Sequence, residues 1–234
     1  METGCSEEDR MKEDWKFHKA EAYHAKTGDF ANRVDREVVS RLIEGESGRA
    51  LDLPCGTGRM TPLLRERFDT YSADYSPTML EFAARDKVFQ GARLDAFAMG
   101  VNDSSFDLVH SLRLSFHYSD FDRILKEFHR VLKPGGVLVF DSLNTGSSRW
   151  LFSFPMNWAR GRESRRVHFR SRIQLLDLLE DQGFEVEAME ARYLLPTRLY
   201  RSLPAWLCRL LEWMEVLVPQ NLLVLTFWKV RKIG

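Results

Sequence analysis

Short apolar runs alternate with amphipathic stripes along most of the chain. The near-continuous run 106–112, broken by His110 and Ser111, and the continuous run 137–140 are typical of strands buried on both faces of a sheet. Residues 120–132 instead carry apolar side chains at helical spacing, and a proline and two glycines follow. The order after residue 30 is helix, strand, helix, strand, helix, strand, strand, helix, strand, an irregular stretch, a helix and two closing strands. This alternation predicts an α/β fold with a doubly wound, mostly parallel sheet.

Local signals add several helix ends. Ser76 is expected to cap a helix that has Pro77 in its first turn, and Ser171 to cap a later helix that ends at Gly183. Residues 221–231 form the predicted last strand.

The loop after the first buried strand carries the strongest functional signal. Residues 50–58 read ALDLPCGTG, an apolar run that ends at Asp52 and turns through two glycines before a helix begins. Glycine allows a ligand to approach closely, and the start of a helix presents free backbone N–H groups. The loop therefore indicates a nucleotide-type site, although a phosphate site and a plain tight turn remain alternatives for such a loop alone.

A second acidic residue, Asp74, ends the next predicted strand. A carboxylate at that point can accept hydrogen bonds from both hydroxyls of a ribose. A dinucleotide-binding loop would carry a third glycine where this chain has Thr61, so the pattern disfavours NAD.

Together with the segments 94–96, 103–109 and 132–140, these features resemble the class I S-adenosylmethionine (SAM)-dependent methyltransferases, in particular the small-molecule branch called type 11. The resemblance covers about residues 48–142. It implies a Rossmann-like sheet of seven strands, mostly parallel with an antiparallel last strand, and SAM as the cofactor. In that family an acidic residue is followed by three glycines at alternate positions, and here Pro54 replaces the first of them.

The resemblance also implies individual contacts with the cofactor. Asp74 would hold the ribose hydroxyls and Met79 would pack near the adenine. Asp95 would accept from the adenine amino group, and the Ala96 N–H would donate to a ring nitrogen, although Asp95 alone would read as a surface carboxylate. The full set of expected contacts is Asp52, Pro54, Cys55, Gly56, Gly58, Asp74, Tyr75, Met79, Asp95, Ala96 and Ser111.

Histidine is common in that family near the methyl donor, where this chain has His117. An imidazole there can act as a general base for a hydroxyl acceptor, or it can close the loop through hydrogen bonds. Residues 1–47 are expected to form a helical lid, with Tyr23 near the methyl donor or packed onto the core. Arg113 could pair with an anionic acceptor or with the SAM carboxylate, or it could be exposed.

Two segments interrupt the methyltransferase pattern within residues 48–234. Residues 143–170 gather aromatic and arginine side chains and are expected to cover a pocket, with a solvated surface, a membrane interface and a nucleic-acid contact as alternatives. Residues 193–218 contain a helix whose apolar surface is wider than one core contact requires. An apolar substrate, a homodimer or a peripheral membrane contact through residues 200–218 would use that surface, and ordinary core packing is the alternative.

Composition narrows the setting. Lys and Arg total 34, as do Asp and Glu, so no net charge attracts nucleic acid, and none is expected as a partner. Three widely spaced cysteines argue against a disulfide framework or a metal site and favour the cytoplasm. The polar N-terminus does not read as a secretory signal, and no apolar run is long enough to span a bilayer.

The sequence thus predicts a SAM-dependent methyltransferase that transfers a methyl group to an oxygen, nitrogen or carbon atom of a small, partly apolar acceptor. The alternative is a methyltransferase-like protein with weak catalysis that acts as an interaction partner.

Overall fold

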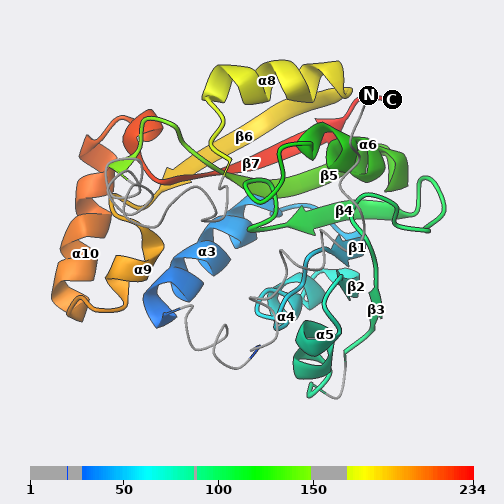
Figure 1. Cartoon of the computed structure of the whole chain (residues 1–234), viewed down its shortest axis with the longest axis horizontal. Helices are drawn as coiled ribbons and strands as arrows, with labels where there is room; N and C mark the ends of the chain where they lie inside the picture. The colour runs from blue at the N-terminus through cyan, green and yellow to red at the C-terminus, as the bar shows by residue number, and fades with distance from the viewer. Residues whose placement is uncertain (1–19, 21–27, 87–88, 149–167) are drawn as a thin grey trace, which may run out of the picture.

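The computed structural model describes residues 20, 28–86, 89–148 and 168–234. Its centre is a seven-stranded sheet with the order β3-β2-β1-β4-β5-β7-β6 (Figure 1). The strands are β1 Gly48–Asp52, β2 Phe68–Asp74, β3 Gly91–Arg93, β4 Phe106–Ser111, β5 Leu132–Leu143, β6 Phe184–Arg192 and β7 Leu225–Lys232. Strands β1 to β5 pair in parallel, and β7 runs antiparallel to both β5 and β6. The predicted mostly parallel sheet with an antiparallel last strand is therefore confirmed.

Helices cover both faces of the sheet. Their bounds are α3 Asp29–Leu42, α4 Thr61–Arg65, α5 Pro77–Ala83, α6 Phe121–Val131, α8 Arg172–Asp181, α9 Thr197–Tyr200 and α10 Ala205–Met214, with short 3₁₀ helices η2 Glu215–Leu217 and η3 Gln220–Leu222. Alternate side chains of β5 show the two layers. Val137 and Val139 pack with α3, α4, α9 and α10, whereas Leu138 and Phe140 pack with α6 and α8.

The structure confirms one of the two predicted helix caps. Ser171 and Gln174 form a reciprocal capping box at the start of α8, and Gly183 after its end has a φ of 74°. Ser76 does occupy the position before α5 with Pro77 in the first turn, but its side chain makes no capping bond with the described chain. The last strand begins at Leu225 rather than at residue 221, because residues 220–222 turn as η3 first.

The carboxyl ends of β1, β2 and β4 meet at the point where the strand order reverses, between β1 and β4. In open α/β sheets this is where ligands bind. The segment between β6 and β7 holds α9 and α10, which lie at one edge of the molecule in Figure 1. No helix in the described ranges has both the length and the apolar character needed to cross a bilayer.

Candidate functional site

The loop that follows β1 is tied to the end of β2. The Cys55 N–H donates to the Ala73 carbonyl at 2.8 Å, and the Gly56 N–H donates to Asp74 Oδ2 at 2.8 Å. Gly56 and Gly58 have φ values of 55° and 77°, a left-handed conformation that favours glycine. A Cβ added at Gly56 would meet no atom within 4 Å, so the loop faces open space there.

Asp74 is 5% exposed, and each of its oxygens accepts from a backbone amide. Oδ1 accepts from the Ser76 N–H at 2.9 Å, which ties the start of α5 to the end of β2. Burial raises the pKa of Asp74 to about 6, although the amides of Ser76 and Gly56 act in the opposite direction. A carboxylate has about four lone-pair sites, so Asp74 can still accept from a ribose hydroxyl beside its backbone amides.

Asp52 lies beneath this loop and is 1% exposed. Its Oδ1 is 2.8 Å from His110 Nδ1, and its Oδ2 accepts from Thr61 Oγ1 at 2.9 Å. The carboxylate thereby links β1 to β4 and to the first residue of α4. The sequence did not single out His110 as a partner for Asp52. The cofactor contact expected of Asp52 stays a prediction.

Ser111, at the carboxyl end of β4, is buried, and its Oγ has no hydrogen-bond partner in the described part of the chain. A buried hydroxyl without a partner is costly unless a ligand satisfies it. This hydroxyl, the open space at Gly56 and the Asp74 carboxylate lie at the carboxyl ends of β4, β1 and β2. They fit the adenosyl group that the sequence resemblance implies.

The roles of the remaining expected cofactor contacts stay predictions. Met79 is fully buried in α5, and Ala96 is nearly so. The Tyr75 ring stacks under the Arg93 guanidinium at 4.7 Å, and Asp95 Oδ1 accepts from the Phe97 N–H at 2.9 Å.

Pro54 and Cys55 lie in the loop itself, where the Leu53–Pro54 peptide bond is cis. Burial and the neighbouring Asp52 raise the pKa of the Cys55 thiol, so the thiol stays protonated at neutral pH.

A second polar cluster lies at the carboxyl ends of β4 and β5. Arg113 donates through its guanidinium to Asp141 and, at 2.7 Å, to Asp35, and its backbone N–H donates to Asp141 at 2.7 Å. Asp35 also accepts from Arg59 at 3.0 Å and from the Tyr193 hydroxyl at 2.7 Å. We call these five residues the Asp35 network. Its two aspartates are fully buried.

Charge balance holds the Asp35 network together. Burial alone would raise the pKa of Asp35, but Arg113 and Arg59 outweigh it and lower that pKa. At Asp141 burial outweighs the opposing effect of Arg113, and the pKa is raised. Arg113 adopts a φ of 65°, unusual for a residue with a side chain, which brings its N–H and guanidinium to the same carboxylate. Arg113 is thus bound to two carboxylates rather than exposed.

The two other sequence candidates have different outcomes. His117 is partly buried, and its ring centroid lies 4.9 Å from that of Phe116. Its backbone N–H donates to the Leu114 carbonyl. Its role as a base stays a prediction. Tyr23, most of the lid segment 1–47 and most of the segment 143–170 lie outside the described residues.

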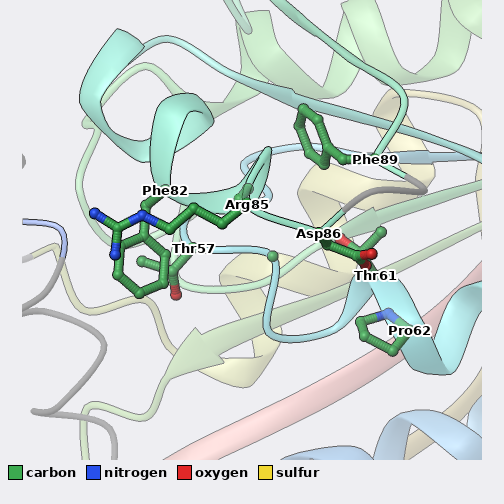
Figure 2. A pocket seen from close by; sticks show the side chains of 9 residues that line it. Thr57, Thr61, Pro62, Phe82, Arg85, Asp86 and Phe89 are labelled. Carbon is green, nitrogen blue, oxygen red and sulfur yellow. The ribbon is translucent and has the colours of Figure 1, made fainter.

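A separate hollow of about 420 Å³ lies between α4 and α5. Figure 2 shows Phe82 and Arg85 of the α5 region at one end, and Thr61 and Pro62 of α4 at the other. Gly58 lines this hollow, and no other predicted cofactor contact in the described chain does so. The hollow therefore touches the glycine loop but not the other residues expected to hold the cofactor.

Comparison with known proteins agrees with this geometry. Residues 51–140 match the family model described as a methyltransferase domain. A demethylmenaquinone methyltransferase of Thermus thermophilus is 35% identical over 46% of this chain and 52% of its own length. A malonyl-[acyl-carrier protein] O-methyltransferase of Coxiella burnetii is 31% identical over 77% of this chain and 64% of its own length.

The chain thus spans between about half and two thirds of the length of these curated relatives. Among solved structures, a SAM-dependent methyltransferase of Thermotoga maritima superposes with a TM-score of 0.66 at 19% identity, over 92% of this chain and 97% of that one, and so shows the shared fold. These findings support the class I SAM-dependent methyltransferase family that the sequence resemblance implies, with a methyltransferase domain over residues 51–140 and SAM as the cofactor.

Proposed function

We propose that the protein transfers a methyl group from SAM to a small, partly apolar acceptor. One observation carries the proposal most directly. The glycine loop after β1, the Asp74 carboxylate and the unpartnered Ser111 hydroxyl all lie at the carboxyl ends of adjacent parallel strands. An adenosyl group can use these three features together, through close approach, ribose hydroxyl bonds and a hydrogen bond to serine.

The chain's own residues would mainly position the reactants. SAM when bound supplies a methyl group on a sulfonium, which is an excellent leaving group, so alignment of the acceptor contributes most to the rate. Asp74 would fix the ribose and the glycine loop would leave room for the amino-acid part. Arg113 in the Asp35 network would give the acceptor side of the crevice a rigid wall, because two buried carboxylates hold it.

The relatives support a choice of acceptor class. One is named for demethylmenaquinone and another for O-methylation of a malonyl group on acyl carrier protein. These names favour an acceptor with an apolar portion and, in the second case, an oxygen as the attacking atom. We therefore propose that the acceptor combines an apolar body with a hydroxyl or carboxylate oxygen.

His117 would then act as the general base when the acceptor is a hydroxyl. Replacement by glutamine would lower kcat roughly 10²–10⁴-fold, with the KM for SAM unchanged, because proton transfer is lost while the cofactor site is kept. A His117→Gln enzyme with wild-type kcat would show that the histidine only shapes the loop.

The cofactor part of the proposal is tested by calorimetric titration of the purified protein with SAM, S-adenosylhomocysteine and NAD. Loss of the ribose contact in Asp74→Ala should weaken S-adenosylhomocysteine binding by about 1.5–3 kcal/mol, because a charged acceptor is removed. Asp69→Ala is the matched control, since Asp69 is an exposed carboxylate on the same strand. It should bind like the wild type.

Wild-type protein that binds neither SAM nor S-adenosylhomocysteine would contradict the proposal and favour the non-catalytic interaction partner. Equal losses in Asp74→Ala and Asp69→Ala would contradict the ribose contact alone.

A further inference from the structure

The helix α10 exposes an apolar stripe to solvent. Trp206, Leu210 and Trp213 stand one helical turn apart, with exposed fractions of 67%, 44% and 65%. The stripe continues past the helix end with Val216 and Leu217, which are 85% and 68% exposed. Figure 1 shows α10 at one edge of the molecule. We call these five residues the α10 face.

The core does not require the α10 face. The opposite side of the helix already supplies the core contact, through Cys208, which is buried, and Leu211, which packs against the core. The helix is thus apolar on two sides, and one of them faces water. An apolar patch of this kind on a protein surface marks an interaction site.

The exposed charges of the segment that carries the α10 face all have one sign. Across residues 197–222 the exposed charged residues are Arg198, Arg201 and Arg209, and none of them forms an ion pair with the described part of the chain. Arg209 lies on the same side of α10 as the two tryptophans, by helical spacing.

The two glutamates of the helix region are occupied. Glu212 accepts from Arg33 at 2.7 Å and from Arg192 at 2.9 Å. Glu215 is 7% exposed and accepts from the Tyr193 N–H at 3.0 Å. The exposed charges of the segment are therefore all positive, although the chain as a whole has no net charge.

This combination decides between partners. A second copy of the chain meeting the same face would bring the arginines of both copies together, because a twofold interface is built from identical patches. An anionic bilayer carries the charge opposite to that of the arginines. It buries apolar side chains at the boundary between headgroups and acyl chains, and tryptophan is enriched at this interface. We propose that the α10 face docks on the surface of an anionic lipid bilayer, with the three arginines at the headgroups.

The proposal is tested by co-sedimentation of the full chain with vesicles, and it does not depend on methyl transfer. Vesicles of phosphatidylcholine with phosphatidylserine are compared with vesicles of phosphatidylcholine alone. We expect at least about ten-fold tighter binding to the anionic vesicles, since each arginine near such a surface contributes roughly five-fold. Raising the salt concentration should reduce that preference.

Two variants separate the apolar and the charged contributions. Trp206→Ser with Trp213→Ser should lower binding to anionic vesicles about ten-fold or more, because apolar burial is lost. Arg209→Glu should reduce the preference for anionic vesicles more than ten-fold, since it reverses one charge, at roughly five-fold for each unit of charge. Matched controls are Ile173→Ser and Arg172→Glu on α8, where both residues are exposed. They should leave binding unchanged.

Failure of the wild-type chain to sediment with anionic vesicles would overturn the proposal. Equal binding to both kinds of vesicle, or equal losses in the α8 controls, would overturn it as well. Self-association in size-exclusion chromatography that disappears in the double tryptophan variant, without vesicle binding, would assign the face to a second copy instead. Because all substituted residues are exposed, unchanged far-ultraviolet circular dichroism serves as the folding control.

Discussion

The edge of the sheet formed by the carboxyl ends of its parallel strands has two halves that are built differently. At the ends of β1 and β2, backbone amides of the loop bind one carboxylate, Asp74, and leave glycine space open. At the ends of β4 and β5, the Asp35 network joins side chains from α3, the glycine loop, β5 and the segment after β6. The first half can receive a ligand with little rearrangement, whereas the second is already satisfied by its own ion pairs.

This difference suggests a division of work. A site made of backbone groups and one carboxylate suits a constant cofactor, because few side chains need to be kept. A buried network of opposite charges fixes geometry at a cost in desolvation and holds several elements in one arrangement. We expect substitutions in the first half to change binding and those in the second half to change stability.

The largest expected effect comes from Asp35. In Asp35→Ala the guanidinium groups of Arg59 and Arg113 lose a fully buried partner, so the free energy of unfolding should fall by about 3–5 kcal/mol. Urea unfolding followed by circular dichroism measures the change. Asp29→Ala is the control on the same helix, where the exposed carboxylate contributes about 0.3–1 kcal/mol through the helix dipole. A similar loss of unfolding free energy in both variants would contradict the stabilising role of the Asp35 network.

The next effect is a dependence of cofactor binding on pH. With a pKa of about 6, Asp74 is ionised above that pH and protonated below it. A protonated carboxyl accepts hydrogen bonds more weakly, so S-adenosylhomocysteine affinity should be highest above pH 7 and fall roughly five-fold as the pH drops through 6. Titration calorimetry between pH 5 and pH 8, values chosen about one to two units either side of that pKa, measures it. In Asp74→Ala the step near pH 6 should disappear, and its persistence would assign it to another group.

The two halves also differ in how far the sequence predicts them. The glycine loop and Asp74 are visible because each lies at the end of its own strand within a short segment, and local order then fixes their positions. The Asp35 network joins residues far apart in the chain. Asp35 stands within the buried stripe of α3 and Asp141 within the apolar run of β5, which are the signals that a buried partner exists.

Other parts escape prediction for physical reasons. The sequence places Ser76 as a side-chain cap, but its side chain makes no capping bond with the described chain, and its backbone N–H instead donates to the Asp74 carboxylate. Arg113 reads as an exposed residue or an anion ligand, and only its left-handed backbone brings it to Asp141. Such outcomes depend on distant carboxylates that no local spacing reveals.

The smallest expected effect comes from two serines near the carboxyl end of β4, Ser111 and Ser115. Ser111→Ala removes a buried hydroxyl without a partner in the described chain, so stability should stay equal or rise, while S-adenosylhomocysteine affinity should fall by about 0.5–1.5 kcal/mol. Ser115→Ala should instead lower stability by about 1 kcal/mol and leave S-adenosylhomocysteine affinity unchanged. The Ser115 hydroxyl donates to the Asp141 carbonyl at 2.5 Å, and the variant loses this bond. Thermal unfolding and calorimetry on both variants measure the two quantities. If Ser111→Ala lost stability and kept its affinity, the hydroxyl would belong to the fold, and the adenosyl contact assigned to the end of β4 would be wrong.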